Sequence, residues 1–334
     1  MMTTVTAPGK IILCGEYAVL DGASAICMAV NRRARAKVCA VNADFHTVRT
    51  SGHVDGEWRF RVDKNGSFKW FRRAPPADGL ELLQQIWKTI NIKGEFDIEL
   101  NTEAFLDPDS QLKLGLGSSA ALTIALITAL FNVLGTPLDA VSEAVKMHRL
   151  FQHGRGSGVD IAASFNGGII EYRMQESAVC RSLKWPAGLE YAVLWSGQPV
   201  STREKLKKLD EGRRNGRPAA SLTCLHDAAE ATAMTWTTGS TAELLNEFSC
   251  YIDVLKQFDV DHDLGIFNSG HRKLVDLATK QNVVYKPCGA GGGDAGIVLS
   301  TDRQALENFT RCAETNGFQL LNVSLENRGV LLES

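Results

Sequence analysis

The chain has little that would place it in a membrane. Its most apolar stretch, residues 120–134, is interrupted by threonine and asparagine and is too short to span a bilayer comfortably. The first ten residues, MMTTVTAPGK, lack the basic segment and apolar core of a secretory leader. We therefore expect a cytoplasmic protein that works without a membrane.

Cysteine pairs with metal-binding or redox spacing are also missing. None of the eight cysteines forms a CxxC pair, and no cysteine–histidine cluster has zinc-ligand spacing. Most of them lie in apolar stretches, where a thiol behaves as a small hydrophobic group. We expect reduced thiols at all eight positions: Cys14, Cys27, Cys39, Cys180, Cys224, Cys250, Cys288 and Cys312.

An excess of one charge is absent too. The 334 residues include 36 Lys+Arg and 38 Asp+Glu, for a net charge of −2. Binding to nucleic acid needs clustered excess lysine and arginine, so we expect a small-molecule partner and no nucleic acid. Apolar residues make up 44% and charged residues 22%, which is ordinary for a globular protein and excludes disordered, collagen-like and coiled-coil chains.

Helical and strand patterns alternate without the regular order of a doubly wound sheet, which predicts an α+β fold. The strongest predicted helix covers residues 118–134 and is followed by Gly135. Pro186 and Gly188 interrupt the pattern, so we expect two domains, 1–186 and 187–334. Further helices are expected at 80–91, 138–151, 203–217, 219–236, 242–258 and 271–281, and strands at 11–13, 25–30, 34–41, 95–100, 167–172, 191–196, 295–300 and 330–332, with a hairpin over 53–70.

The first of three glycine-rich segments is PGKIILCGEYAVLDG, residues 8–22. Lys10 precedes a predicted strand, and Gly15 and Glu16 follow it in a turn. This order can place a cation in a cleft. Taken alone, the segment equally fits a strand with an exposed lysine and a tight turn.

The second segment, GLGSSAA at residues 115–121, precedes the strongest helix. Glycines let the backbone approach a ligand closely, and the free N–H groups of a helix start favour a phosphate. A serine hydroxyl there can also hold Mg²⁺. The segment is neither a Walker sequence nor GxGxxG. Its serines also fit a plain helix cap.

The third segment, KPCGAGGGDAG at residues 286–296, holds five glycines. Ordering so many glycines costs conformational entropy, so we expect contact with a ligand to offset that cost; an ordinary flexible turn is the alternative. Between the second and third segments, Asp160 lies in a small-residue loop, GRGSGVDIAASFNGG. This acid fits either a cleft or a helix cap.

Taken in this order, the segments resemble the motifs of the GHMP kinase superfamily, from Pro8 to Ser300. The resemblance implies a two-domain α+β fold. The N-terminal half should be like domain 2 of ribosomal protein S5, with a left-handed crossover, and the C-terminal half ferredoxin-like. It also implies that the protein uses ATP and Mg²⁺.

The family's site residues carry over onto matching positions. Lys10 and Asp160 match the catalytic pair, and Ser119 matches the serine that holds Mg²⁺. The loop expected to bind ATP comprises Gly115, Leu116, Gly117, Ser118, Ser119 and Ala120. The residues expected at the acceptor substrate are Glu16, Tyr17, Arg149, Ser157, Ser201, Gly289, Ala290, Gly291, Gly292, Gly293 and Asp294.

Three details favour the phosphomevalonate kinase branch over mevalonate kinases. Tyr17 stands where mevalonate kinases usually have histidine, Arg149 replaces their magnesium-binding glutamate, and Asp294 is an acid that their third motif usually lacks. The segment WSGQPVSTREK, residues 195–205, also looks like the WTGxxxST stretch of phosphomevalonate kinases. A mevalonate kinase, a sugar kinase and a non-catalytic ligand sensor remain alternatives. The decarboxylase branch fits poorly because it lacks the lysine of the first motif.

Charge gives an independent hint about the acceptor. A phosphate monoester brings about −1.5 to −2 at pH 7 and needs cations, with arginine favoured for bidentate contact. Lys10, Arg149, Arg155 and Arg203 are candidates. Each arginine also fits a solvated surface charge. We expect a monomer or a homodimer.

Overall fold

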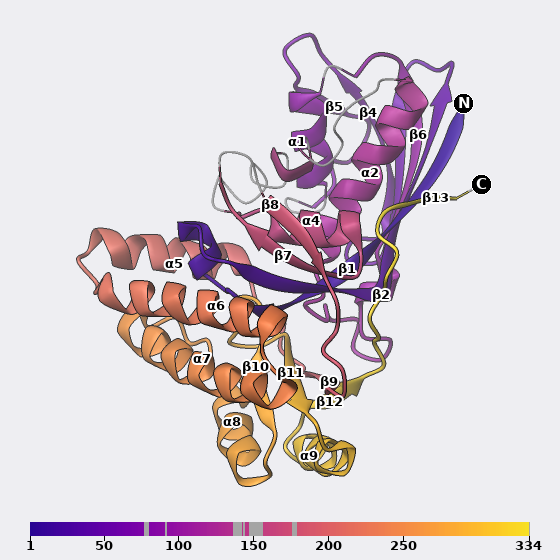
Figure 1. The fold of residues 1–334 in the computed structure, drawn as a ribbon. Helices are drawn as coiled ribbons and strands as arrows, with labels where there is room; N and C mark the ends of the chain where they lie inside the picture. Colours follow the sequence, from indigo (N-terminus) through magenta and orange to yellow (C-terminus); the bar gives the residue numbers. More distant parts are fainter. Residues whose placement is uncertain are drawn as a thin grey trace.

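The computed structural model describes residues 1–76, 80–90, 92–135, 142, 144–146, 156–175 and 179–333. Two β-sheets, each covered by helices, form the two halves of the molecule (Figure 1). The predicted α+β architecture is confirmed. No helix in these ranges is long and apolar enough to cross a membrane.

The larger sheet has nine strands in the order β13-β1-β2-β6-β3-β4-β5, with β7 and β8 attached beside β2. Its strands pair antiparallel apart from β3 and β6, which are parallel. The bounds are β1 Met2–Cys14, β2 Ala25–Val41, β3 His46–Ser51, β4 Gly56–Val62, β5 Phe68–Trp70, β6 Glu95–Asn101, β7 Ile169–Arg173, β8 Val179–Leu183 and β13 Leu331–Glu333.

Strand β1 supplies the lysine of the first motif. Its pairing with β2 shifts in register between Pro8 and Gly9. A Cβ atom on Gly9 would lie 2.5 Å from the carbonyl oxygen of Leu116, and the Lys10 N–H donates to that same oxygen at 2.8 Å. Glycine thus allows β1 to touch the loop of the second motif directly, which fixes Lys10 next to it.

Helix α2 (Ser118–Leu134) packs across β1 and β2 and has the predicted bounds. Ten of its residues are buried, so its long apolar body forms much of the core between helix and sheet. Two shorter helices, α1 (Glu81–Thr89) and α4 (Val159–Asn166), contact α2. The 3₁₀ helices are Ala18–Asp21 and Glu103–Phe105.

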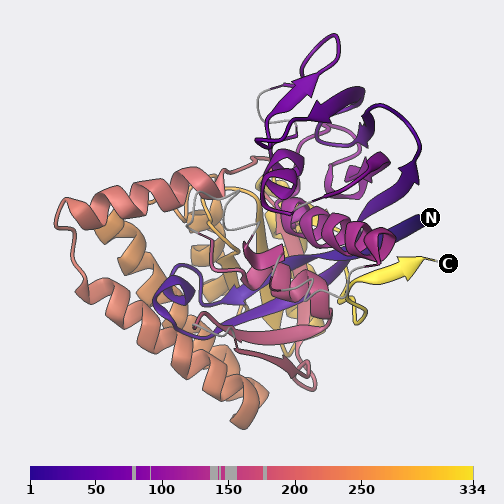
Figure 2. The same cartoon turned by 90° about the horizontal axis from the view of Figure 1, so that it is seen from above.

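The smaller sheet is antiparallel, in the order β10-β11-β9-β12. Helices α7, α8 and α9 contact it, while α6 and α7 lie side by side at the edge of the molecule (Figure 2). The bounds are α5 Thr202–Arg214, α6 Ala220–Thr238, α7 Thr241–His262, α8 His271–Lys280, α9 Arg303–Thr315, β9 Glu190–Trp195, β10 Val284–Pro287, β11 Ala295–Ser300 and β12 Gln319–Leu321.

The sheets divide the chain near the predicted boundary, with one exception. Strand β9 opens the smaller sheet at Glu190, yet β13 returns to pair with β1 in the larger sheet. The chain termini therefore lie on neighbouring strands (Figure 2). The division at residue 186 and the handedness of the crossover stay predictions.

The hydrophobic pattern does not predict several elements, namely β3, β8, β10, β12, α4 and α9. Strand β8 is largely exposed and carries no buried alternation, while α9 is mainly polar with a narrow buried face. Short or solvent-facing elements show little periodicity in their apolar residues, so the hydrophobic pattern of the sequence does not reveal them. The helix expected at 138–151 falls mostly outside the described residues.

Candidate active site

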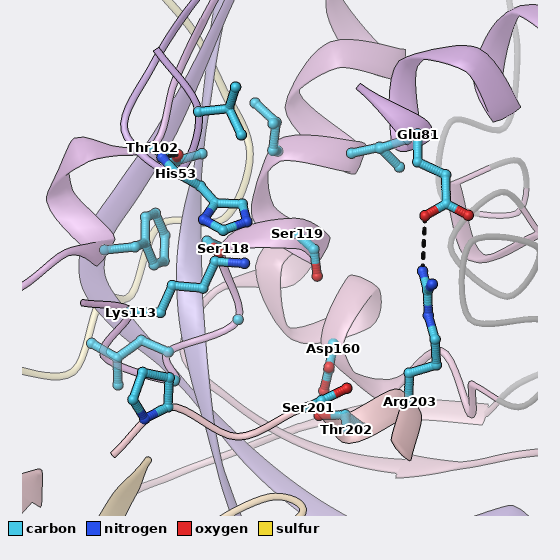
Figure 3. Close-up of a pocket in the computed structure, with 18 of the residues that line it drawn as sticks. His53, Glu81, Thr102, Lys113, Ser118, Ser119, Asp160, Ser201, Thr202 and Arg203 are labelled. Carbon is cyan, nitrogen blue, oxygen red and sulfur yellow. Dashed lines mark hydrogen bonds and ion pairs between the residues drawn. The ribbon is translucent and has the colours of Figure 1, made fainter. Parts of the chain in front are cut away.

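A cavity of about 640 Å³ lies where the two halves meet (Figure 3). Its walls come from β1, α1, α2, α4 and the start of α5. The lining residues with polar or charged side chains are Lys10, Thr50, Ser51, His53, Glu81, Thr102, Lys113, Ser118, Ser119, Asp160, Ser201, Thr202, Arg203, Glu204 and Asp294. The predicted ATP loop, catalytic pair and Asp294 therefore share one cavity.

The catalytic pair predicted from the sequence is an ion pair in the structure. Lys10 Nζ lies 3.2 Å from Asp160 Oδ1, and their side chains are 10% and 22% exposed. Burial alone would lower the pKa of Lys10, but Asp160, with smaller contributions from Cys27 and Asp294, outweighs it and raises that pKa. Lys10 thus carries a fixed positive charge at the cavity wall. Lys10 lies on strand β1, and Asp160 lies in the first turn of α4.

The loop before α2 is shaped for close approach to a ligand. Gly115 and Gly117 have φ values of 74° and 79°, in the left-handed region that glycine adopts readily. A Cβ atom on Gly117 would lie 2.9 Å from Lys10 Cε. Ser118 and Ser119, in the first turn of α2, line the cavity with their side chains (Figure 3). The N-terminus of a long helix thus opens onto the cavity, which favours an anion there.

The third glycine-rich loop follows β10, and most of its glycines face protein. A Cβ atom on Gly291 would lie 2.5 Å from Ile266 Cγ2. One on Gly292 would lie 2.5 Å from the Gly265 carbonyl oxygen, and one on Gly293 would lie 2.4 Å from the Gln198 carbonyl oxygen. Packing against protein therefore accounts for these three glycines, and contact of the loop with a ligand stays a prediction. Close packing of backbone on backbone requires them.

The beginning of this loop does approach the catalytic pair. A Cβ atom on Gly289 would lie 4.0 Å from Lys10 Nζ. Gly289 and Ala290 also line a small cavity of about 30 Å³ together with Lys10, Cys288 and Asp294. Buried His271 supports the far end of the loop, because its Nε2 lies 2.9 Å from the Gly293 carbonyl oxygen, and burial lowers its pKa to about 4.

Glu16 and Tyr17, which the sequence places at the acceptor substrate, are not among the residues that line the large cavity. The Glu16 carboxylate is buried against Lys286 Nζ and accepts a hydrogen bond of 2.7 Å from the Tyr251 hydroxyl. Tyr17 is also buried, and its hydroxyl donates to the Ala290 carbonyl oxygen at 2.6 Å. Both side chains hold the first motif to the C-terminal half instead.

The remaining predicted residues take separate positions. Ser201 lines the cavity as the N-cap of α5, accepting from the Glu204 N–H at 3.3 Å. Ser157 is buried beside Asp160's helix; its hydroxyl accepts from the Val159 N–H at 3.3 Å. Arg149 and Arg155 lie outside the described residues. Arg203 reaches across the cavity to Glu81 Oε2 at 3.0 Å (Figure 3).

Sequence reasoning missed one end of the cavity. There the walls are apolar, and His53, Thr102 and Lys113 supply polar groups (Figure 3). Lys113 stands two residues before the second motif, which is the one signal that could have identified it. The others come from turns and strands far apart in the sequence. The apolar residues lining the cavity are Val54, Leu80, Leu82, Leu83, Leu100, Phe105, Leu116, Leu122, Leu126, Pro199 and Val200.

The site combines an anion-binding helix start, a charged lysine paired with an acid, and an apolar recess in one cleft. That combination is suited to a small-molecule kinase, which positions a nucleotide's phosphates and stabilises their charge.

Comparisons with known proteins agree with this class. A family model described as the GHMP kinases N terminal domain matches residues 80–168. A phosphomevalonate kinase from Streptomyces sp. (strain CL190) is 30% identical over 345 residues, covering 91% of each chain. A mevalonate kinase from Schizosaccharomyces pombe is 26% identical, covering 93% of this chain and 86% of its own.

Solved structures share the fold over almost the whole chain. A Lin0012 protein from Listeria innocua superposes with a TM-score of 0.82 at 24% identity, covering 100% of both chains. The Streptococcus pneumoniae phosphomevalonate kinase in complex with phosphomevalonate and AMPPNP has a TM-score of 0.75 at 17% identity, covering 96% of this chain and 99% of its own. The chain belongs to the GHMP kinase superfamily and is an ATP-dependent phosphotransferase.

Proposed function

We propose that the protein transfers the γ-phosphoryl group of ATP to 5-phosphomevalonate, giving 5-diphosphomevalonate. The observation that carries this proposal is the 30% identity to a phosphomevalonate kinase over 91% of both chains. Tyr17 and Asp294, which distinguish the sequence from the usual mevalonate kinase motifs, support it.

The cavity suggests where each part of ATP binds. Its apolar recess, formed in part by Leu83, Leu100 and Phe105, suits the adenine ring. The loop at Gly115–Ser119 and the N-terminus of α2 would bind the phosphates. Lys113, which lines the same cavity, would add a positive charge beside them. In this arrangement the γ-phosphate would point toward the pair formed by Lys10 and Asp160.

The oxygen donors at the cavity suit a magnesium ion that is held mainly by nucleotide phosphates. Among the described residues no group of three or more histidine, cysteine or acidic side chains could hold a metal. Mg²⁺ commonly takes one or two protein oxygens and completes its shell with phosphates and water. The Ser119 hydroxyl, which lines the cavity, would be such a ligand. Bound there, the ion would neutralise charge on the phosphates.

Lys10 would stabilise negative charge on the phosphoryl group as it moves, because its ammonium lies in a poorly solvated wall. A phosphate oxygen of the acceptor is already ionised near neutral pH, so it needs no base. Asp160 would then hold Lys10 in position through their 3.2 Å ion pair. With a hydroxyl acceptor, by contrast, Asp160 would take the hydroxyl proton.

A mevalonate kinase is the second candidate, favoured by 26% identity to the Schizosaccharomyces pombe enzyme over 93% of this chain. The test is ADP release by the purified protein with Mg²⁺·ATP and either (R)-5-phosphomevalonate or (R)-mevalonate. Turnover with the phosphorylated acceptor alone supports the proposal. Turnover with mevalonate alone overturns it in favour of a hydroxyl kinase. No ADP release with either acceptor overturns it, and sugars and other alcohols are then the acceptors to test.

Asp160→Asn sharpens this test. We expect it to impair a phosphate acceptor's reaction less than a hydroxyl acceptor's, because only the latter needs a base. A Lys10→Ala/Asp160→Ala variant with wild-type ATP turnover would contradict the site assignment altogether.

A further inference from the structure

Asp294 joins parts of the site that belong to different halves of the molecule. It follows the third glycine-rich loop and has a φ of 51°, a conformation in which aspartate is more readily accommodated than most residues. Its N–H donates to the Gln198 carbonyl oxygen at 2.7 Å, and its own carbonyl oxygen accepts from the Ser196 N–H at 2.9 Å. The Asp294 backbone thus fixes the segment that leads into α5.

The carboxylate extends this connection. Its Oδ1 accepts a hydrogen bond from the Val200 N–H at 3.1 Å. Val200 and Ser201 immediately precede α5, and both line the large cavity. The side chain of Asp294 therefore sets where α5 begins relative to the cavity.

The same side chain lies against the loop expected to bind phosphates. A Cβ atom on Gly115 would be 2.4 Å from Asp294 Cβ and 2.5 Å from its Cγ. Gly115 belongs to the N-terminal half and Asp294 to the C-terminal half. The absence of a side chain at Gly115 thus allows the two halves to meet at the phosphate loop.

The charge of Asp294 is costly at this place. Burial raises the pKa of its carboxyl to about 6, while the Val200 N–H, Lys10 and Lys113 act in the opposite direction. Lys10 comes from β1, and Lys113 from the segment before the phosphate loop. A carboxylate that lines a phosphate-binding cavity also repels the ligand's negative charge. Electrostatics therefore disfavours an acid here. The contacts of Asp294 with Val200 and Gly115 instead suit a residue that positions the start of α5 against the phosphate loop.

We propose that Asp294 is a positioning residue, which sets the phosphate loop and the start of α5 in register across the cleft through its shape and its hydrogen bond to Val200, and not through its charge. Asparagine keeps that shape and an oxygen that can accept from Val200, whereas alanine keeps neither. Asp294→Asn and Asp294→Ala both remove the charge, so comparing them isolates the contact.

The first measurement is steady-state turnover of the full chain. Displacing a reacting group by about 1 Å can cost on the order of 100-fold in rate. We expect kcat to fall at least about 30-fold in Asp294→Ala and to stay within about 3-fold of wild type in Asp294→Asn. Unchanged kcat in Asp294→Ala overturns the proposal. An equal loss in both variants also overturns it, because the charge itself would then be required.

The second measurement is calorimetric titration with Mg²⁺·ADP alone. Turnover rests on the proposed acceptor, whereas ADP binding rests only on the chain being an ATP-dependent kinase. We expect Asp294→Asn to bind ADP about 3- to 10-fold more tightly than wild type, because a repulsive charge is removed while the loop stays in place. Asp294→Ala should bind more weakly than Asp294→Asn. Equal affinity in the two variants overturns the proposal even if no acceptor is turned over.

Asp302→Ala provides the matched control. Asp302 is also an aspartate whose carboxylate accepts from backbone N–H groups near a helix start, those of Gln304 and Ala305 in α9. It lies outside the cavity-lining residues. We expect its kinetics to match wild type. Thermal unfolding of all variants establishes that each is folded when assayed.

Discussion

Two lysine–carboxylate pairs of the same chemistry occupy opposite surroundings in this protein. Lys10 and Asp160 lie at the wall of the large cavity, with side chains 10% and 22% exposed. Lys286 and Glu16 are 1% and 2% exposed and lie outside the cavity residues. Both lysines have a raised pKa despite burial, because a carboxylate faces each one.

The difference lies in what else each pair can contact. Tyr251 completes the buried pair: its hydroxyl donates to Glu16 Oε2 at 2.7 Å and accepts from the Gly15 N–H at 2.9 Å. That pair joins the first motif to β10 of the other half and does not line the cavity. The Lys10 pair opens onto a cavity. Burial thus turns one pair into a structural link and leaves the other available for chemistry.

Breaking the buried pair should have the largest effect. Lys286→Met leaves the Glu16 carboxylate buried without its counter-ion, and we expect a loss of about 3–5 kcal/mol in the free energy of unfolding. Urea denaturation measures this. The double variant Glu16→Gln/Lys286→Met removes both charges and should recover most of the loss. A double variant as unstable as Lys286→Met would show that the ion pair itself contributes net stability.

Removing the cavity lysine should affect rate more than stability. Lys10→Met deletes the charge that we propose stabilises the transferred phosphoryl group, so we expect kcat to fall about 10²–10³-fold, or about 3–4 kcal/mol in transition-state free energy. The free energy of unfolding should change by only about 1 kcal/mol, because Asp160 then faces a cavity that water can enter. Turnover assays and urea denaturation on the same preparation test both parts. If Lys10→Met lowered the free energy of unfolding as much as Lys286→Met, the two pairs would not differ in their contribution to stability.

A third carboxylate, that of Asp294, lines the cavity, and through it the free energy of unfolding of the protein should depend on pH. Its pKa is raised to about 6, so the folded protein carries a penalty above pH 6 that disappears as the pH falls through 6 toward the ordinary aspartate pKa of about 4. Asp294→Asn should therefore stabilise the protein by about 1–2 kcal/mol at pH 8. Urea denaturation from pH 8 to 4 should show this gain shrinking below pH 6. A gain that grows as the pH falls would contradict the raised pKa.

The ion pair between Glu81 and Arg203 should have the smallest effect. It joins α1 to α5 at 3.0 Å, but its side chains are 23% and 34% exposed, so water screens the interaction. Glu81→Gln should lower the free energy of unfolding by less than about 1 kcal/mol, and less still in high salt. A loss comparable to that of Lys286→Met would mean that exposure does not separate these pairs.

Much of the site was predictable because its motifs are local. The Gly115–Ser119 loop and the helix that begins at Ser118 follow from a short segment whose backbone requirements are encoded nearby. That Lys10 and Asp160 belong to one site was expected from the resemblance of their segments to the family's motifs, and the structure pairs them. The roles of Glu16 and Tyr17 were not predictable. Their partners Lys286, Tyr251 and Ala290 are more than 230 positions away. Motif position alone does not distinguish a ligand contact from a buried link.

The glycines of the third loop teach the same lesson. Their number indicated close approach to the backbone, and Ile266, Gly265 and Gln198 lie where a Cβ atom on these glycines would be. A high glycine content shows that other atoms can come close to the backbone, but it does not show whether those atoms belong to a ligand or to the protein itself.

The sequence by itself determined the α+β class, the long helix behind the phosphate loop and the family to which the chain belongs, because these depend on hydrophobic period and on local glycine and serine chemistry. Only the tertiary structure decided that the Lys10–Asp160 pair lines a cavity while the Lys286–Glu16 pair is buried, and that Asp294 meets Gly115 across the cleft. Burial and long-range contact depend on how distant segments pack, and that packing cannot be read from the neighbours of a residue in the chain.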